Sequence, residues 1–342
     1  MGMPDAPNIQ QLSVVIATYN RCEVLKTTLK CLVNQTLPPN AFEVIVVDDG
    51  STDNTARDIP EFISNLPYET SFFTHENRGP GYTENRGIRK AKNRIVLLLA
   101  DDIWATPELL QEHLSTHKRY PADNIAVLGK VLQSPELPDT VIQRNWDPFL
   151  FNRFEDMEMV DPIYFYACNI SVKKNFLIEN GMFVERKGAA HEDAELGYRL
   201  GQKGLEIIYN KRALAYHYHQ ETLDALVKRA YERGRNFDVL MNTVPGAYLY
   251  PVYKIFSFAA PVNYLIKTFP REIVRRAMFN ALSVSLFWLP LLRLAEKNGM
   301  AALLARPLAY RGVNGYFLRK GYRDMRRTSR HPAETGRQKC RT

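Results

Sequence analysis

The sequence predicts an α/β fold, in which a mostly parallel, doubly wound sheet is followed by a mainly helical, basic region. Short runs of aliphatic and β-branched residues alternate with helical spacing over roughly the first hundred residues, as expected for a parallel sheet covered by helices. Several of these runs end directly in aspartates, at the edge where open α/β sheets bind ligands. The balance of charge also reverses along the chain, which separates a second region from the first.

The stretch from Ile95 to Pro107 carries the strongest of these signals. Its apolar run, Ile95 to Leu99, indicates a strand buried on both faces, and Asp101 and Asp102 follow where that strand would end. Two adjacent carboxylates repel each other unless a cation lies beside them, so the pair indicates a divalent cation together with phosphate oxygens. The alternative is a solvated turn in which an aspartate caps the helix that begins near Pro107.

Other strands and helices are predicted on both sides of this stretch. Helical spacing follows Arg21, precedes Ile95 and recurs over 107–119 and 173–180, where Gly181 closes the last helix in the left-handed conformation. No GxGxxG motif follows the first strand, so an ordinary dinucleotide site is not indicated. Apolar runs predict the further strands over residues 12–17, 42–47, 68–75, 125–131 and 163–172.

The segment over residues 133–162 loses periodicity but holds several aromatic residues. Its length and composition favour a functional loop over a site, and the alternative is a loop packed by its own side chains. The aromatic residues are Trp146, Phe149, Phe151 and Phe154.

A second group of titratable residues begins at residue 191. A predicted helix begins with His191, Glu192 and Asp193 and ends near Gly204. An aspartate at a helix start can have a role in a site, and the alternative is that it is merely a helix cap. His217 and His219 lie two residues apart on an extended segment, so their side chains share one face. Paired histidines on a strand face indicate a ligand-binding constellation.

The formal net charge of +8 is unevenly distributed. Residues 1–220 hold 23 Lys and Arg against 29 Asp and Glu, a net of −6, whereas residues 221–342 hold 22 against 8, a net of +14. Basicity of that size implies an anionic partner, which could be a membrane surface, a nucleic acid or an anionic substrate. No signal-peptide pattern opens the sequence. The scattered cysteines, Cys22, Cys31, Cys168 and Cys340, fit a reducing cytosol without disulfides.

Two apolar stretches follow the helical segment over 221–236. The first, 250–269, is interrupted by charged residues and a proline, and the second, 277–295, has 16 residues without a charge. Both fall short of the roughly 20 apolar residues that a spanning helix needs. Arg271, Arg275, Arg276 and Arg293 lie at the edges of the second stretch, so we expect helices lying in the plane of an anionic membrane. Helices packed on the first domain are the alternative.

Four motifs lie in order along the first 220 residues: VVIATYNR at 14–21, VVDDGSTDNT at 46–55, LLLADDIW at 97–104, and HEDAELGYRLGQKG at 191–204 followed by AYHYH at 215–219. Taken together they resemble a family-2 glycosyltransferase of the GT-A fold. The resemblance implies a nucleotide-sugar-binding catalytic domain over 10–220. It leaves a helical, basic, membrane-associating region over 221–330 and a flexible tail over 331–342.

The resemblance also assigns roles to residues. Asp193 matches the catalytic base, and Glu192 would hold the acceptor or orient that base. The metal, Mn²⁺ or Mg²⁺, would be bound by Asp102 with His217 or His219. Two departures stand out: the DXD motif falls on Ala100-Asp101-Asp102 without its first acid, and Glu84 stands where many relatives carry an arginine. The nucleotide would contact Ala17, Thr18, Tyr19, Arg21, Asp49, Arg78, Arg86 and Asp101.

The function implied is inverting transfer of a sugar from a nucleotide diphosphate, with UDP preferred, to a glycan or lipid-linked acceptor. Such a hexosyltransferase-like enzyme of class EC 2.4 is expected in the cytoplasm or on the inner face of the membrane. A nucleotidyltransferase of similar fold is one alternative, but ATYNR lacks the Gly-rich loop with Arg and Lys that is usual there. A non-catalytic scaffold on an anionic surface is another. Apolar stretches between the arginines disfavour nucleic acid as the partner.

Overall fold

The computed structural model describes residues 12–145, 149, 151–188, 190–246, 248, 273–297 and 307–330. The chain divides into two compact units. Unit 1 comprises Met1–Leu137 and Pro148–His219, and unit 2 comprises Pro138–Asp147 and Gln220–Thr342. Several features named above lie outside the described residues, namely the apolar stretch over 250–269, the tail over 331–342, Trp146, Arg271 and Cys340.

Unit 1 is built on one sheet with the strand order β3-β2-β1-β4-β8-β6-β9-β5, and β7 pairs with β9 off this path. Parallel pairing dominates: it joins the first four strands and also joins β6 to β9, whereas β8, β5 and β7 run antiparallel to their neighbours. The strands are β1 (Leu12–Thr18), β2 (Phe42–Asp48), β3 (Glu69–Thr74), β4 (Ile95–Leu99), β5 (Ile103–Ala105), β6 (Ile125–Gln133), β7 (Met159–Val160), β8 (Asn169–Lys173) and β9 (Glu206–His217).

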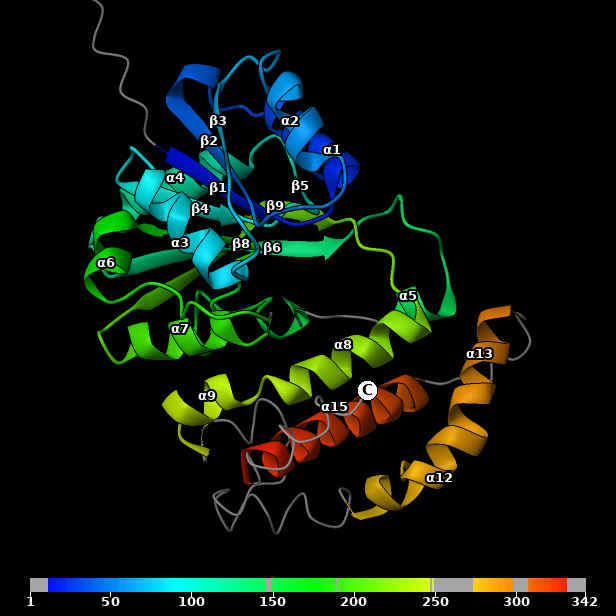
Figure 1. Cartoon of the computed structure of the whole chain (residues 1–342). Coiled ribbons are helices and arrows are strands. Elements are labelled where there is room, and N and C mark those ends of the chain that lie inside the picture. The colour runs from blue at the N-terminus through cyan, green and yellow to red at the C-terminus, as the bar shows by residue number, and fades with distance from the viewer. Residues whose placement is uncertain are drawn as a thin grey trace, which may run out of the picture. The chain divides into compact units, whose positions relative to one another are not determined.

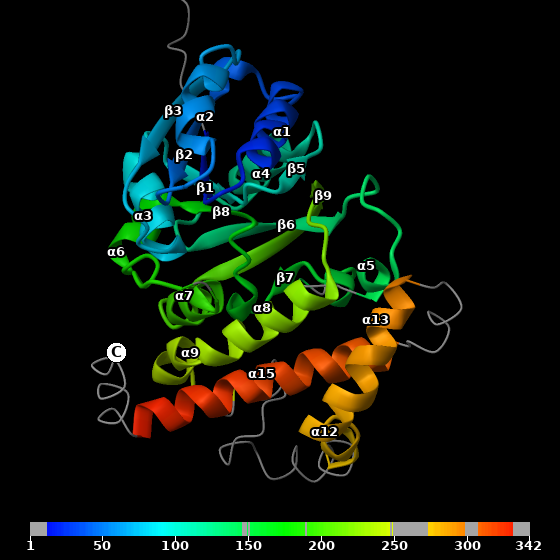
Figure 2. The ribbon, with the colours of Figure 1, turned by 45° about the vertical axis from the view of Figure 1, so that its right-hand side comes forward.

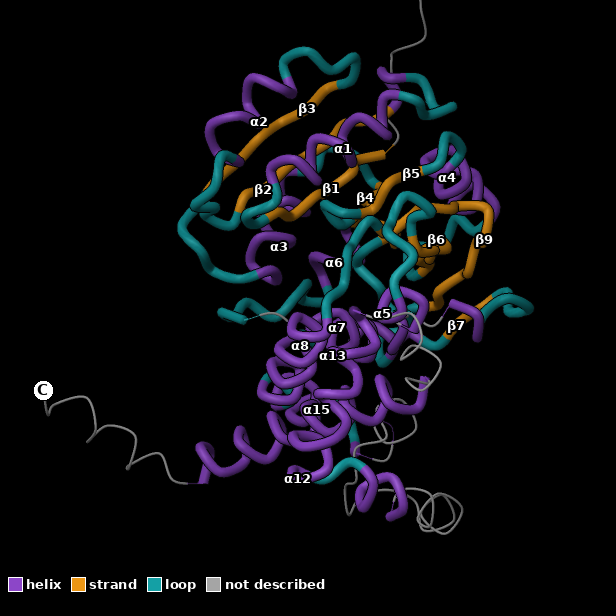
Figure 3. The backbone as a smooth tube through the Cα atoms, turned by 90° about the vertical axis from the view of Figure 1, so that its right-hand side faces the viewer, coloured by secondary structure: helices purple, strands orange, loops and turns teal. Residues whose placement is uncertain are grey.

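Helices cover both faces of this sheet (Figure 1). The chain moves outward from β1 to β3 and then returns to β4, so right-handed crossovers place α1 and α2 on one face and α3 on the other (Figure 3). The aliphatic side chains of β1, β2 and β4 are therefore buried on both sides. The helices of unit 1 are α1 (Cys22–Val33), α2 (Thr55–Ile63), α3 (Pro80–Lys90), α4 (Leu109–Arg119), α6 (Lys174–Glu179) and α7 (Glu192–Gly201).

The predicted α/β class, with a parallel-dominated sheet and a helical C-terminal region, is confirmed. The strand predicted over 163–172 is wrong in its first half, because Pro162–Tyr164 forms a 3-10 turn, η3. Asp161 starts that turn by accepting the N–H of Ile163 at 2.9 Å. Extended pairing begins only at Asn169, while Tyr166 packs edge-on against Phe151. The aromatic residues that suggested a strand are thus packed in a loop cluster.

Unit 2 is helical, and α8 (Leu223–Arg235) and α15 (Pro307–Arg330) lie side by side in it (Figures 1 and 2). The two backbones approach closely where a glycine sits on each helix: a Cβ on Gly234 would lie 2.1 Å from the Leu318 carbonyl oxygen. None of the described helices has the length and apolar content required to cross a bilayer. The other elements are α5 (Val141–Asn145), α9 (Asp238–Thr243), α12 (Ala281–Ser283), a π-helical turn η4 (Val284–Trp288) and α13 (Leu289–Lys297).

Candidate active site

The end of β4 brings Asp102 against side chains from two other parts of unit 1. One oxygen of Asp102, Oδ2, accepts a hydrogen bond from Nη1 of Arg21 at 2.5 Å. Nε2 of His217 lies 3.3 Å and Nδ1 of His219 lies 3.4 Å from that same oxygen. Backbone pairing positions the histidines, because Ile103 is the β5 partner of His217 and the N–H of Tyr218 donates to the Asp102 carbonyl at 2.9 Å.

Asp102, His217 and His219 can hold a metal ion. Their donor atoms all lie within 4.8 Å of one another, and the two imidazole rings are nearly parallel, with centroids 5.4 Å apart. One carboxylate oxygen and two imidazole nitrogens suit a divalent transition metal, and the nitrogens favour Mn²⁺ over Mg²⁺. The prediction left open which histidine takes part, and the structure brings both to the same carboxylate.

The two aspartates at this strand end are not a solvated turn. Asp101 and Asp102 are 6% and 5% exposed, and Arg21 Nη1 also lies 3.0 Å from Asp101 Oδ1. Burial alone would raise the pKa of Asp102, but its hydrogen bonds to His217 and His219 and the charge of Arg21 hold that pKa well below its usual range. Burial raises the pKa of Asp101 to about 6, against the opposing charge of Arg21. Asp102 is therefore the more acidic member of the pair.

Asp193 does not act as a cap of α7. The helix is preceded by His191 in the left-handed conformation, and the Asp193 carboxylate accepts the N–H of Ala167, on another segment, at 3.2 Å. Burial, together with the charge of neighbouring Glu192, raises the pKa of Asp193 to about 7. Glu192 also has a raised pKa because of burial, and its Oε2 accepts the N–H of Ala190 at 2.7 Å. A carboxyl group that titrates near neutral pH suits proton transfer.

Asp193 and Asp102 belong to the same edge of the sheet. The segment that holds Asp193 through Ala167 continues into Cys168, whose carbonyl accepts the N–H of Ala100 at 3.2 Å. The Cys168 thiol is buried, and its pKa is raised by burial first and then by the charges of Asp193 and Asp102.

Glu84 is a member of this acidic group that the prediction did not include. Burial raises the pKa of Glu84 well above its usual value, and the charges of Asp193 and Asp101 raise it further. The neighbouring Asn85 ties α3 to the segment before α7, because its amide exchanges two hydrogen bonds of 2.9 Å with the backbone of Phe183. The signal in the sequence was the glutamate in place of an arginine, which marks a chemical difference at the site.

Asp49 ties the end of β2 to the loop that begins α3. Its carboxylate accepts the N–H groups of Arg78 at 2.8 Å and Gly79 at 3.0 Å, and Nε2 of His75 lies 3.2 Å away. Gly79 is required there because its φ is +94° and a Cβ would lie 2.1 Å from the Arg186 carbonyl oxygen. The role of Asp49 in binding a base stays a prediction.

The remaining predicted nucleotide contacts also surround these strand ends. Ala17 and Thr18 end β1, where the Thr18 hydroxyl donates to Asp101 Oδ2 at 2.8 Å, and Tyr19 is 44% exposed just beyond. Two arginines have partners within the chain. The guanidinium of Arg78 lies 3.7 Å over the Tyr82 ring, and Arg86 donates to the Thr74 carbonyl at 2.7 Å.

Relatives of known name share much of this chain. Validoxylamine A glucosyltransferase of Streptomyces hygroscopicus subsp. limoneus is 31% identical over 238 residues, which cover 62% of this chain and 52% of that protein. Chondroitin synthase of Escherichia coli is 28% identical over 278 residues, which cover 70% of this chain and 39% of that protein. The chain thus spans about half the length, or less, of these curated relatives.

A solved structure shows the same fold. A mannosyltransferase of Pyrobaculum calidifontis, solved in complex with GDP-Man and Mn²⁺, superposes with a TM-score of 0.60 at 17% identity, covering 93% of this chain and 87% of that one. Residues 13–178 match the family profile described as "Glycosyl transferase family 2". The profile, the relatives and the fold agree with the motifs at the strand ends, and residues 13–178 belong to glycosyltransferase family 2.

Proposed function

We propose that the chain transfers a sugar from a nucleotide-diphosphate donor, with UDP preferred, to a hydroxyl of a glycan or lipid-linked acceptor. The observation that carries this proposal is the joint placement of two groups at one sheet edge. Asp102, His217 and His219 form a metal-type donor set, and Asp193 is a carboxyl with a pKa of about 7. Family membership supports the reaction class.

The chain's own residues supply the proton transfer. In an inverting displacement the acceptor hydroxyl attacks the anomeric carbon while a carboxylate on the acceptor side removes its proton. The Asp193 carboxylate is proposed as that base, held toward the site by the N–H of Ala167. Glu192 is next to it, and its own carboxylate is held by the Ala190 N–H. After transfer, the Asp193 proton would return to solvent.

The leaving group in this reaction is a nucleoside diphosphate. A divalent cation bound by Asp102, His217 and His219 would neutralise the negative charge that develops on it. Arg21 compensates Asp101 and Asp102 in the protein alone, with its guanidinium between the two carboxylates. The proposed donor contacts, Thr18, Arg21 and Asp101, are thus already joined in one hydrogen-bonded group.

The proposal places the enzyme at the cytoplasmic face of a membrane, where it would act on a cell-envelope polysaccharide or on a lipid-linked glycan. The net charge of +14 over residues 221–342 supports attraction to anionic lipid. Enzyme and lipid-linked acceptor would then share one surface.

Calorimetric titration with UDP, GDP, ADP, CDP and dTDP, each with and without MnCl₂, tests the donor chemistry. We expect UDP to bind best and only weakly without Mn²⁺. A nucleotidyltransferase would instead bind nucleoside triphosphates and release pyrophosphate in the presence of a sugar phosphate. If none of the five diphosphates binds under either condition, the proposed function is wrong.

A further inference from the structure

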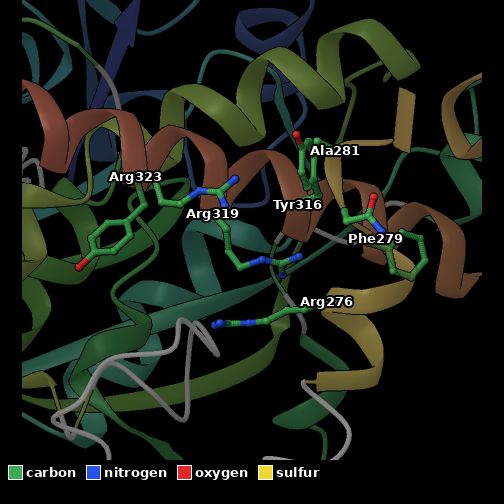
Figure 4. Close-up of a pocket in the computed structure, with 8 residues that line it drawn as sticks. Arg276, Phe279, Ala281, Tyr316, Arg319 and Arg323 are labelled. Carbon is green, nitrogen blue, oxygen red and sulfur yellow. The ribbon is translucent and has the colours of Figure 1, made fainter. Parts of the chain in front are cut away.

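Unit 2 holds a pocket of about 320 Å³, and none of the proposed catalytic or metal-binding residues is among those that line it. One wall comes from the segment before and at the start of α12, and the other comes from α15 (Figure 4). Three arginines from these two walls line it, and no carboxylate is among its lining residues. The residues that matter here are Arg276, Phe279, Asn280, Tyr316, Arg319 and Arg323.

The chemistry of this lining suits a phosphate group. Guanidinium groups offer paired N–H donors that match phosphate oxygens, and hydrogen bonds between ionised partners are about twice as strong as neutral ones. Tyr316, Tyr322 and Asn280 add neutral donors. The pocket is thus positively charged and rich in hydrogen-bond donors, in the half of the chain that carries the positive charge.

The pocket wall that precedes and begins α12 is held in place by packing against α15. The Phe279 ring is buried against Gly312 on α15, where a Cβ would lie 2.1 Å from the ring. Phe279 also stacks on Trp288 with centroids 4.8 Å apart. Asn280 and Ser283 form a capping box that starts α12, with reciprocal hydrogen bonds of 3.0 and 3.1 Å. Arg276 is therefore carried by a segment anchored to α15.

Large apolar side chains next to the pocket in the sequence are exposed. Of the 16 large hydrophobic residues that are exposed in the described chain, eight lie between residues 273 and 308. Leu286 is 71% exposed and Leu282 is 68% exposed, more than any of the others. The exposed side chains in the segment that supplies Arg276 and Phe279 are Ile273, Val274, Met278, Leu282, Leu286 and Phe287.

We propose that this pocket binds the phosphate of an anionic phospholipid headgroup while the exposed apolar side chains over 273–287 enter the membrane interface. A soluble phosphate ester could bind the guanidinium groups of the pocket but would leave these apolar side chains in water. A lipid surface offers phosphate to the guanidinium groups and also removes the apolar side chains from water, which is favourable by about 25 cal/mol per Å² of apolar area buried. The inference rests on the proposed membrane contact and is independent of the donor chemistry.

Flotation of the full-length protein with vesicles tests the pocket. We compare phosphatidylcholine vesicles with vesicles that also contain phosphatidylglycerol, using Arg319→Gln/Arg323→Gln and the control Arg326→Gln/Arg327→Gln. Both double variants remove two charges from α15, but only Arg319 and Arg323 line the pocket. We expect the pocket pair to weaken binding to anionic vesicles at least about tenfold more than the control, since it removes hydrogen bonds to a charged group. Equal losses would mean non-specific attraction and would overturn the proposal.

A second pair of variants tests the apolar contact. Leu286→Ser/Phe287→Ser should abolish the binding that survives high salt. The control Met157→Ser/Met159→Ser, which changes two exposed apolar residues of unit 1 (47% and 46% exposed), should not. Displacement of the protein from vesicles by millimolar glycerol 3-phosphate would assign the pocket to a soluble ligand and contradict the proposal.

Two measurements keep these outcomes interpretable. Mn²⁺-dependent nucleotide binding should be unchanged in the pocket variants, and circular dichroism should show an unchanged fold. If the glutamine pair fails to fold, Arg319→Lys/Arg323→Lys keeps both charges and should still bind less tightly than wild type because the paired donors are lost. Wild-type binding by a folded lysine pair would contradict the proposed recognition of phosphate by the guanidinium groups.

Discussion

Unit 1 and unit 2 place their charged side chains in opposite ways. In unit 1 the carboxylates of Asp101 and Asp102 are buried at a strand end and are compensated within the chain by Arg21. In unit 2 Arg276 and Arg323 are exposed, and so are the apolar side chains that precede and follow Phe279. Buried, paired charges hold a fixed geometry, which chemistry needs, whereas exposed charges can be reached by a partner outside the chain.

The backbone explains the difference. The strand ends of unit 1 are fixed by ladders on both sides, so side chains at residues 18, 48 and 101 face one edge with little freedom. In unit 2, Gly321 allows α15 to approach the Tyr231 carbonyl oxygen closely. Arg323, Arg326 and Arg327 on the same helix are exposed. The following predictions test this contrast, from the largest expected effect to the smallest.

Asp193→Asn should have the largest effect on the reaction. The amide cannot accept the proton of the acceptor hydroxyl, so transfer should fall by about 10² or more, while donor binding stays intact. Initial rates and calorimetric donor affinity measured on the same preparation check this. The Asn side-chain oxygen can still accept the N–H of Ala167, so a near wild-type rate would mean that Asp193 is structural.

Asp102→Asn should remove the metal dependence of nucleotide binding. The amide keeps the size of the side chain but loses the charge that faces His217 and His219. We expect the affinity for UDP in the presence of Mn²⁺ to fall about tenfold or more, toward the metal-free value. Titration with Mn²⁺ monitored by electron paramagnetic resonance measures the ion directly. Equal Mn²⁺-stimulated binding in mutant and wild type would exclude this metal site.

The transfer rate should rise with pH up to neutrality. Burial and Glu192 raise the pKa of Asp193 to about 7, so the fraction ionised falls about tenfold for each pH unit below that value. The same carboxyl binds a proton more tightly in the folded than in the unfolded chain. Its contribution to stability is complete below about pH 4 and is lost as the pH rises through about 7. A flat profile of kcat/KM between pH 5.5 and 8 would contradict the assignment.

Arg21→Gln should destabilise the metal-free protein and make it respond more strongly to Mn²⁺. Two buried carboxylates would lose their compensating charge, at a cost of about 1–3 kcal/mol because Arg21 is partly exposed to solvent. Thermal unfolding in EDTA and in MnCl₂ checks this, with Arg57→Gln as control, since Arg57 is exposed and pairs only locally with Asp58. Mn²⁺ should raise the midpoint more in Arg21→Gln than in wild type, and identical shifts would contradict the role of Arg21.

Glu84→Gln should change the rate least, within about twofold. Burial, and then the charges of Asp193 and Asp101, raise the pKa of Glu84 well above its usual value, which favours the neutral carboxyl, and an amide is also neutral and of the same size. The pH profile of transfer measures this, because an ionised Glu84 would add a second titration. A large drop at pH 7 would show that Glu84 carries a charge that the site uses.

The sequence by itself determined most of the strands, the acidic side chains at their ends and the resemblance to the family. Continuous aliphatic runs have one stable place, between two layers of helices, and parallel strands bring their carboxyl ends to one edge. For that reason the stretch from Ile95 to Asp102 was interpretable without a structure. The reversal of charge near residue 220 was also clear from the sequence, because net charge follows from residue counts and does not depend on the fold.

Tertiary structure alone decided which distant residues meet. Both histidines reach Asp102 because β9 pairs antiparallel with β5, and register between strands more than 100 residues apart leaves no mark in local spacing. The pairing of Asp193 with the N–H of Ala167, the 3-10 turn at Pro162 and the place of Glu84 among the acids arose in the same way. The basic pocket of unit 2 joins Arg276 to Arg323 through the packing of Phe279 on Gly312. Local patterns report which face of an element is buried, whereas contact between elements depends on packing that the whole fold determines.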